Sequence, residues 1–255
     1  MTKVLSGKTA LVTGAGRGIG KAIAQQLAED GALVAVHYGH AEAAAEAVVA
    51  EIVASGGRAF AIGADLLSVP NIVSLFAKLD AGLIERTGSK DLDILVNNAG
   101  AGAQCSIDQT TEEQFDFVFN INVKSLLFCM QHAMPRLRDG GRVINISSLS
   151  SRGAVPGLAA YAASKAAVNS LTVSAAAQLG PRGITVNAVA PGMVDTDMTT
   201  ELQKNEALVS MVIAQTAMRR IGRVDDISGV VAMLAAPTSG WITGQVIEAT
   251  GGARM

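Results

Sequence analysis

The chain has 255 residues, of which 49% are hydrophobic and 16% charged, and its formal net charge is −2. This length and composition are typical of a single α/β domain with enough apolar side chains for one large core. No basic run stands out, which argues against a nucleic-acid-binding surface, and no apolar run is long enough to span a bilayer.

The N-terminus has no apolar segment followed by a cleavage site, so we expect a cytoplasmic protein with no membrane partner. The two cysteines, Cys105 and Cys129, lack CxxC or metal-ligand spacing and are expected to be buried thiols. His37 and His40 are close in the chain, but no acidic or thiolate ligand accompanies them. The sequence therefore predicts no metal site.

Short apolar runs alternate with longer alanine-rich helical patterns along the whole chain. Strands are predicted at 8–14, 32–38, 58–65, 92–98, 141–147, 183–190 and 245–252, and helices at 18–30, 41–55, 69–87, 111–138, 158–180 and 224–236. Most strand segments are continuously apolar, as in strands buried on both faces. This alternation predicts a single-domain α/β fold, a Rossmann-type doubly wound parallel sheet of about seven strands with helices on both faces. Ligands of such sheets bind beyond the carboxyl ends of the strands.

The segment TGAGRGIG at 13–20 follows the first predicted strand and opens the first predicted helix. Its glycines let the backbone approach a pyrophosphate, and a helix N-terminus offers free N–H groups and a positive dipole end. A tight turn without a ligand is the alternative. The residues assigned to the cofactor in this loop are Gly14, Gly16, Arg17, Gly18, Ile19 and Gly20.

The glycine spacing, T-G-x-x-x-G-x-G, resembles that of the short-chain dehydrogenase/reductase family. Four further family motifs follow in order, NNAG at 97–100, INISS at 144–148, YAASK at 161–165 and PG at 191–192. The resemblance covers nearly the whole chain and is strongest to the 3-oxoacyl-acyl-carrier-protein reductase-like branch. It implies a single dinucleotide-binding and catalytic domain over 1–255. The further cofactor contacts that it implies are Tyr38, Gly39, Asp65, Leu66, Asn98, Ala99, Gly100, Pro191, Gly192 and Val194.

The predicted cofactor is NADP(H). An acidic residue at the end of the second strand would bind the ribose hydroxyls and repel a 2′-phosphate, and this chain has Tyr38 there. By resemblance, Arg17 in the glycine loop occupies the place of a basic residue that NADP-using relatives carry near that phosphate. A solvated loop charge is the alternative for Arg17. The lack of a second arginine leaves dual specificity open.

Tyr161 and Lys165 are four residues apart in a predicted helix, so both side chains lie on one face. A phenol titrates near about 10, which is too high for efficient proton transfer at neutral pH. We expect the ammonium and the positive nicotinamide of the oxidised cofactor to lower the pKa of the phenol. The resemblance makes Tyr161 the general acid of ketone reduction and Lys165 a ligand of the nicotinamide ribose. An ordinary surface pair is the alternative.

The resemblance implies two further catalytic residues. Ser148, thirteen residues before Tyr161, would hydrogen-bond the substrate oxygen. Asn122, in FNINVKS, would position a water that links Lys165 to solvent. The alternatives for these two roles are Ser147, Ser150, Ser151 and Asn120.

The predicted function is the reversible, NADPH-dependent reduction of a ketone to a secondary alcohol, an oxidoreductase activity. The alternatives are a 3-oxoacyl reductase acting on substrates bound to acyl carrier protein or coenzyme A, and a non-catalytic NADP(H)-binding sensor. A lid at about 193–217, with Met193, Val194 and Met198, and the segment 151–160 would give an apolar pocket suited to a hydrophobic ketone. An amphipathic helix is equally compatible with the lid pattern.

Two kinds of protein partner are considered. An acidic acyl carrier would need arginines near the mouth of the site, for which Arg136, Arg138, Arg152 and Arg182 are candidates, although solvated charges are the simpler interpretation. The resemblance also implies a homotetramer that pairs the helices at 111–138 and 158–180 and packs the tail at 241–255 against a second two-fold axis.

Overall fold

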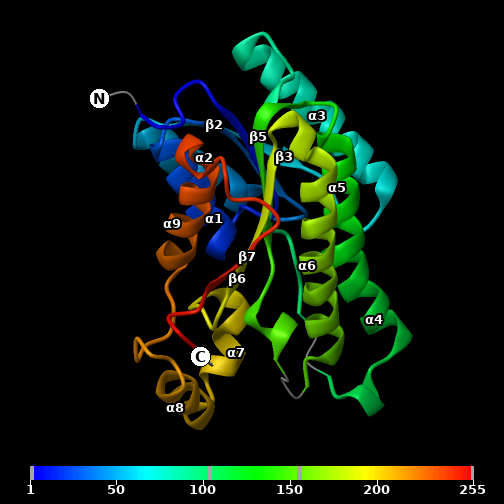
Figure 1. The fold of residues 1–255 in the computed structure, drawn as a ribbon, viewed down its shortest axis with the longest axis vertical. Coiled ribbons are helices and arrows are strands. Elements are labelled where there is room, and N and C mark those ends of the chain that lie inside the picture. Colours follow the sequence, from blue (N-terminus) through cyan, green and yellow to red (C-terminus); the bar gives the residue numbers. More distant parts are fainter. Residues whose placement is uncertain (1–2, 103–104, 154–156, 254–255) are drawn as a thin grey trace.

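The computed structural model describes residues 3–102, 105–153 and 157–253. Within them, seven parallel strands form one sheet in the order β3-β2-β1-β4-β5-β6-β7 (Figure 1). Strand order runs outward in both directions from the neighbouring pair β1 and β4, which confirms the predicted doubly wound Rossmann-type fold. The strands are β1 Thr9–Val12, β2 Leu33–Tyr38, β3 Arg58–Gly63, β4 Leu92–Asn97, β5 Leu137–Ile146, β6 Thr185–Pro191 and β7 Val246–Ala249.

Helices cover both faces of the sheet (Figure 1). One face packs against α1 Gly18–Glu29, α2 Glu42–Ala54 and α9 Val224–Ala235, and the other against α3 Val69–Thr87, α5 Ser125–Ala133 and α6 Ala159–Leu179. Alternate residues of a strand enter opposite layers, so Val12 packs with the first group and Leu11 with the second. Burial on both faces explains why the strand segments are continuously apolar.

The single helix predicted at 111–138 is wrong in two respects. The chain forms α4 Glu112–Phe119, a π-helical turn at Asn120–Lys124, and then α5. The Ser125 N–H bonds to the Asn120 carbonyl five residues back, so one extra residue enters this turn. The helix also ends before 138, because the Leu92 N–H bonds to the Arg136 carbonyl and β5 begins directly afterwards.

The segment predicted to form a lid contains two short helices, α7 Thr200–Gln203 and α8 Glu206–Ala214. Neither helix has a fully buried residue, and the side chain of Met198 just before them is 58% exposed. This part of the chain is thus less firmly packed than the helices against the sheet. Closure over a substrate stays a prediction.

No helix in the described ranges combines the length and apolarity needed to cross a membrane. Across the same residues, no three His, Cys, Asp or Glu side chains gather as metal ligands do. Both cysteines are free thiols. Cys129 is buried in α5, and burial raises its pKa to about 12. Cys105 lies in a loop and is partly exposed, so its predicted burial is wrong.

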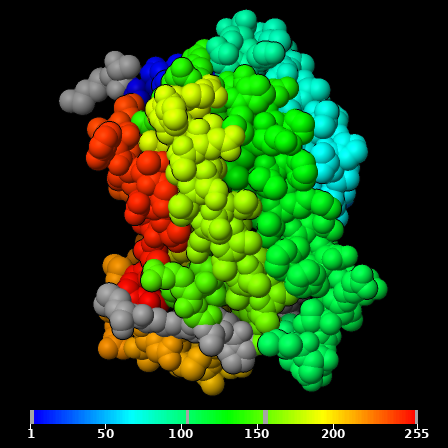
Figure 2. Space-filling view, turned by 45° about the vertical axis from the view of Figure 1, so that its right-hand side comes forward, coloured from blue at the N-terminus to red at the C-terminus, as the bar shows by residue number. Residues whose placement is uncertain are grey.

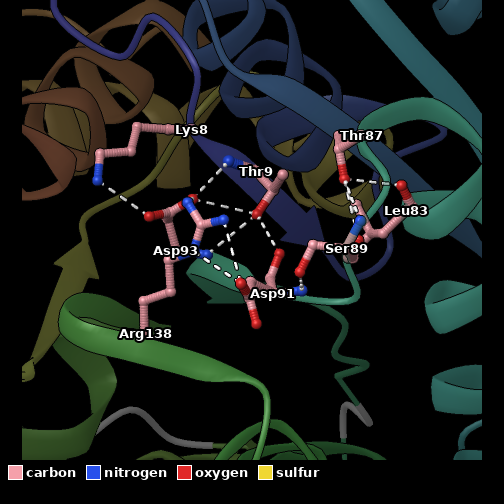
Figure 3. Close-up of polar contacts among 8 residues, drawn as sticks. All are labelled: Lys8, Thr9, Leu83, Thr87, Ser89, Asp91, Asp93 and Arg138. Atoms are coloured by element: carbon pink, nitrogen blue, oxygen red, sulfur yellow. Dashed lines mark hydrogen bonds and ion pairs between the residues drawn. The ribbon is translucent and has the colours of Figure 1, made fainter.

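Asp93 joins β1 and β4 near their amino ends (Figure 3). Its carboxylate is 3% exposed and accepts hydrogen bonds from the Thr9 N–H at 3.0 Å, the Thr9 hydroxyl at 3.2 Å and the Lys8 ammonium at 2.9 Å. Arg138 Nη1 lies 3.7 Å from the same carboxylate. A buried carboxylate is costly unless it is paired in this way, so these contacts fix β1 against β4.

We predict that Asp93→Asn lowers the free energy of unfolding by about 2–3 kcal/mol, because the amide leaves buried donors without their charged acceptor. Urea denaturation measures this directly. The matched control is Asp139→Asn, which removes an exposed carboxylate paired with Arg182 and should leave the midpoint almost unchanged. Equal effects of the two substitutions would contradict the role assigned to Asp93.

Candidate active site

The glycine loop between β1 and α1 is too tightly packed for a side chain at Gly14 and Gly20. A Cβ on Gly20 would lie 2.3 Å from the Gly14 carbonyl oxygen and 2.4 Å from Asn98 Nδ2. Gly14 and Gly18 have φ values of 63° and 54°, in the left-handed region that favours glycine. Helix α1 begins at Gly18, and the side chain of its N-cap residue Arg17 does not cap it. This bare backbone and helix N-terminus fit a dinucleotide pyrophosphate.

Thr13 and Asn98 bind the glycine loop to the end of β4. The Thr13 hydroxyl accepts hydrogen bonds from the N–H groups of Asn98 and Ala99, at 2.9 and 3.0 Å. Asn98 Nδ2 donates to the carbonyls of Thr13 and Gly14, at 2.9 and 3.0 Å. The amide of Asn98 therefore shapes the loop itself. The sequence analysis did not assign a role to Thr13.

His37, near the end of β2, holds the same loop by a hydrogen bond to its backbone. Its Nδ1 accepts a hydrogen bond from the Gly14 N–H at 3.0 Å, and its Nε2 lies 2.9 Å from the Ala64 carbonyl. These bonds require the neutral tautomer with a proton on Nε2. Burial lowers the pKa of His37 to about 4, so the ring stays neutral near physiological pH. Both ring nitrogens are engaged with backbone, which leaves neither for a metal.

The end of β2 carries Tyr38, whose hydroxyl donates to the Glu42 carboxylate at 2.8 Å. This bond and the nearby charge raise the pKa of Tyr38. Glu42 is therefore an acidic group beside the predicted ribose site, which was not predicted although it lies only four residues beyond Tyr38. Arg17 is exposed, and its Nη1 lies 3.7 Å from the Asp197 carboxylate. Asp65 accepts from the Leu67 N–H at 3.0 Å in the turn after β3.

Lys165 projects from α6 into the end of the sheet. It is 4% exposed, and its Nζ donates to the Ile146 carbonyl at 2.9 Å. Burial lowers the pKa of Lys165 to about 8. Its Nζ lies 5.7 Å from the centre of the Tyr161 ring. The predicted placement of both side chains on one face of a helix is thus what the structure has.

The predicted lowering of the Tyr161 pKa is wrong for the protein by itself. The residue is partly exposed, and burial of its phenol raises the pKa above its ordinary value of 10.0. Only the neighbouring Ser148 hydroxyl opposes this shift. The buried Lys165 does not offset the loss of hydration because its own charged form is also disfavoured.

Asn122 is buried inside the π-helical turn. Its Oδ1 accepts from the Ala101 N–H at 2.9 Å, and its Nδ2 donates to the Ala101 carbonyl and the Ser164 hydroxyl, both at 2.9 Å. A Cβ on Gly100 would lie 3.0 Å from Asn122 Oδ1 and 3.4 Å from Lys165 Nζ, so the two side chains meet beside this glycine. The alternative, Asn120, instead accepts from the exposed Lys124 at 2.7 Å.

The serines at the end of β5 point in different directions. The Ser147 hydroxyl donates to Asn169 at 2.6 Å and to the Lys165 carbonyl at 3.2 Å, on the α6 side. Ser148 faces Tyr161 and hydrogen-bonds Ser150 at 2.8 Å. This arrangement brings Ser148 to the phenol and removes Ser147 from it.

The loop after β6 supplies the last predicted contacts. Pro191 ends the strand, and a Cβ on Gly192 would lie 3.2 Å from Thr250 Cα. Val194 is buried in the core, so its side chain does not face an open pocket. Met193 lines a cavity of about 220 Å³ together with Gly192 and Thr250, and its contact with substrate stays a prediction. Thr196, which the sequence analysis missed, approaches the glycine loop, since a Cβ on Gly18 would lie 3.6 Å from its Cγ2.

The four arginines considered for carrier docking do not gather near these residues, as expected for solvated charges. Arg136 pairs with Asp80, Arg138 with Asp91, and Arg182 with Asp139. Arg136 and Arg182 precede strands and Arg138 is the second residue of β5, so all three arginines lie at the amino edge of the sheet, opposite the predicted site. Arg152 alone lies near the carboxyl edge, where it pairs with Glu248 at 2.6 Å. Residues 154–156 of the apolar segment and 254–255 of the predicted interface tail lie outside the described residues.

Comparison with known proteins adds four similarities. Residues 14–254 match the family described as enoyl-(acyl carrier protein) reductase. The hydroxynaphthalene reductase-like protein Arp2 of Metarhizium guizhouense is 44% identical, over 97% of this chain and 95% of that protein. The reductase LugOII, which catalyses keto-reduction at C1 during lugdunomycin biosynthesis, superposes with a TM-score of 0.94 at 44% identity, over 99% of this chain and 100% of that one. The angucycline C-6 ketoreductase LanV with bound NADP gives a TM-score of 0.94 at 43% identity, over 99% and 97%.

The burial of His37 predicts that the fold weakens in mild acid. Because its pKa is lowered from 6.5 to about 4, the stability it contributes is complete above pH 6.5 and is lost as the pH falls toward 4. The loss between pH 7 and pH 5 is about 2 kcal/mol. Urea denaturation of the wild type and His37→Asn at the two pH values measures it, and the variant should lose much less.

The matched control is His40→Asn, because His40 lies three residues after His37 and its side chain is exposed. This variant should lose as much stability as the wild type. Equal losses in the wild type and His37→Asn would show that the buried ring is not the source of the acid sensitivity.

Proposed function

This chain belongs to the short-chain dehydrogenase/reductase family, and we propose that it is an NADPH-dependent carbonyl reductase that reversibly converts a ketone to a secondary alcohol. One observation supports this most strongly. A phenol, a serine hydroxyl and a buried lysine, those of Tyr161, Ser148 and Lys165, meet at the carboxyl ends of the strands beside a glycine loop. This is where an α/β sheet of this type binds its ligand.

The cofactor assignment rests on the fit of the glycine loop and on the relatives. The loop between β1 and α1 accepts a pyrophosphate, and exposed Arg17 is free to turn toward a 2′-phosphate, at the cost of a long, solvated contact with Asp197. LanV holds NADP. The acidic side chains of Glu42 and Glu46 near Tyr38 disfavour this phosphate, so we expect NADPH to be preferred without strict exclusion of NADH. When bound, the cofactor supplies the hydride.

The side chains divide the remaining work. Tyr161 donates a proton to the carbonyl oxygen. Burial raises the pKa of this phenol in the protein by itself, so the lowering that efficient transfer at neutral pH needs has to come from the Lys165 ammonium and the positive nicotinamide of the oxidised cofactor. Ser148 donates a hydrogen bond to the same oxygen, which stabilises the charge that develops there. Lys165, with its pKa of about 8, exchanges protons readily near neutral pH and lies beside Asn122. These two residues are placed to return a proton toward Tyr161.

We assign the substrate to the class of hydrophobic, ring-bearing ketones, with 193–217 as the lid. Relatives are named for hydroxynaphthalene reduction, keto-reduction at C1 and an angucycline C-6 ketone. The rival is an acyl-carrier substrate, which the family description favours. Three of the four arginines considered for carrier docking lie at the wrong edge of the sheet, which argues against it. The intact phenol–lysine pair argues against a sensor without turnover.

Tyr161→Phe tests the proposed activity. The substitution removes the proton donor and keeps the ring, so kcat for ketone reduction should fall by about 10²–10⁴-fold while the Kd for NADPH stays within about twofold. Steady-state assays of NADPH oxidation give kcat, and fluorescence titration with NADPH gives its Kd. Unchanged turnover would refute the role of Tyr161, and lost NADPH binding would show a folding defect instead.

We also infer a homotetramer. The helices α4, α5 and α6 lie side by side on one face, with the C-terminal segment on the far side of α6 (Figure 2). Large apolar side chains are exposed there, including Phe117 at 45%, Leu127 at 42% and Val173 at 53%. Trp241, just before β7, is 99% exposed. Patches of this kind mark protein–protein contacts, and the arrangement supports two interfaces.

Trp241 is the chain's single tryptophan, so its fluorescence reports on the second interface. We predict emission at the shorter wavelengths typical of a covered indole at high concentration, and a shift to longer wavelengths on dilution as the mass from light scattering falls. Trp241→Ala should weaken assembly about 10-fold or more. Emission of an exposed indole in the fully assembled protein would contradict the placement of Trp241 in an interface.

A further inference from the structure

Ser150 holds the hydroxyl of Ser148 on the side away from Tyr161. The Ser150 N–H donates to Ser148 Oγ at 3.2 Å, and the two hydroxyl oxygens are 2.8 Å apart. Both contacts arise because Ser148 caps the short 3₁₀ turn at Leu149–Arg152. Ser150 is 8% exposed, and among the described residues Ser148 is the one hydrogen-bond partner of its hydroxyl.

The number of protons and lone pairs on Ser148 makes this contact consequential. A serine hydroxyl has one proton and two acceptor lone pairs. The Ser150 N–H can only donate, so it occupies one lone pair. If the Ser150 hydroxyl also donates, both lone pairs are engaged and the Ser148 proton must point elsewhere. The remaining direction leads to Tyr161. The Ser148 hydroxyl already acts on that residue, because its hydrogen bond lowers the pKa of the phenol against the effect of burial.

The opposite orientation would work against the reaction. If Ser148 donated to Ser150, its remaining lone pair would face the substrate oxygen, and two acceptors would oppose each other. The orientation with Ser150 as donor is also the one that satisfies the buried Ser150 proton within the described residues. Ser150 thereby decides whether Ser148 donates into the cleft.

The turn that carries both serines is fixed from α6. Asn169 Nδ2 donates to the Ser151 hydroxyl at 2.9 Å, and that hydroxyl donates to the Ser148 carbonyl at 2.7 Å. Asn169 lies one helical turn beyond Lys165, so one helix holds the lysine and anchors the serine turn. Hydrogen bonds to α6 therefore hold the turn, and with it the distance between Ser148 and Ser150, in place.

We propose that Ser150 is a positioning residue for the reaction, which donates its hydroxyl proton to Ser148 and so directs the Ser148 proton to the substrate oxygen and to Tyr161. This rests on the proposed ketone reduction. The Ser150 proposal goes beyond the proposed function because it assigns a role to a residue that touches neither substrate nor cofactor.

A double-mutant cycle on Ser148 and Ser150 tests this. Ser150→Ala should lower kcat for ketone reduction about 10-fold, less than the roughly 10²–10³-fold expected for removing a direct donor to the substrate oxygen. It should also shift the pH profile of alcohol oxidation to higher pH, because the phenolate loses an oriented donor. In the Ser148→Ala background, the same Ser150→Ala change should have no further effect on kcat.

Ser150→Cys guards against a folding artefact, because it keeps the side-chain shape and weakens the donor, and it should match Ser150→Ala. Ser174→Ala, which removes an exposed hydroxyl on the outer face of α6, should leave kcat unchanged. A Ser150→Ala effect that persists in the Ser148→Ala background would overturn the proposal, as would an unshifted pH profile. If Tyr161→Phe and Ser148→Ala both leave turnover intact, the proposed function itself fails, and the Ser150 result is then separate.

Discussion

The site depends on the lock between the carboxyl ends of β1 and β4. These strands are neighbours at the point where strand order reverses, and the Thr13 hydroxyl and the Asn98 amide join them with four hydrogen bonds. The lock forces the chain so close to itself that Gly20 has no space for a Cβ. Because the loop is held by buried bonds, its free N–H groups are set in place before a ligand arrives, which lowers the cost of binding.

Stability and chemistry are placed at opposite edges of the sheet. At the amino edge, Asp93 ties β1 to β4 through fully paired charge, which favours the fold. At the carboxyl edge, burial disfavours the charged forms of Lys165 and Tyr161. The same desolvation raises the pKa of the phenol in the protein by itself and gives a lysine that titrates near 8. Burial of these two groups therefore lowers stability at the edge of the sheet where the reaction is proposed to occur.

Local pattern was sufficient for the fold and for the residues that motifs name. Continuous apolar strands and helical spacing placed all seven strands, and the i, i+4 spacing put Tyr161 and Lys165 on one face. What failed depended on contacts between distant segments. The π-helical turn at Asn120–Lys124, the pairing of the arginines and the burial of Val194 all arise from tertiary packing. For the protein by itself, the direction of the Tyr161 pKa was wrong because proximity of an ammonium is visible in sequence, whereas loss of hydration is not. Thr13 lies inside the glycine motif and Glu42 lies four residues beyond Tyr38, so both could have been predicted from the sequence.

The most direct test compares NADPH and NADH oxidation with two substrates, a fused-ring aromatic ketone and an acetoacetyl thioester. We expect kcat/KM to favour NADPH by about 10-fold or more, since the exposed Arg17 can pair with the 2′-phosphate despite the nearby Glu42, and a single charged contact is worth roughly that factor. We also expect the free ketone to be reduced faster than the thioester. A strong preference for NADH, or turnover confined to the thioester, would contradict the account of this protein as an NADPH-dependent reductase of free ketones.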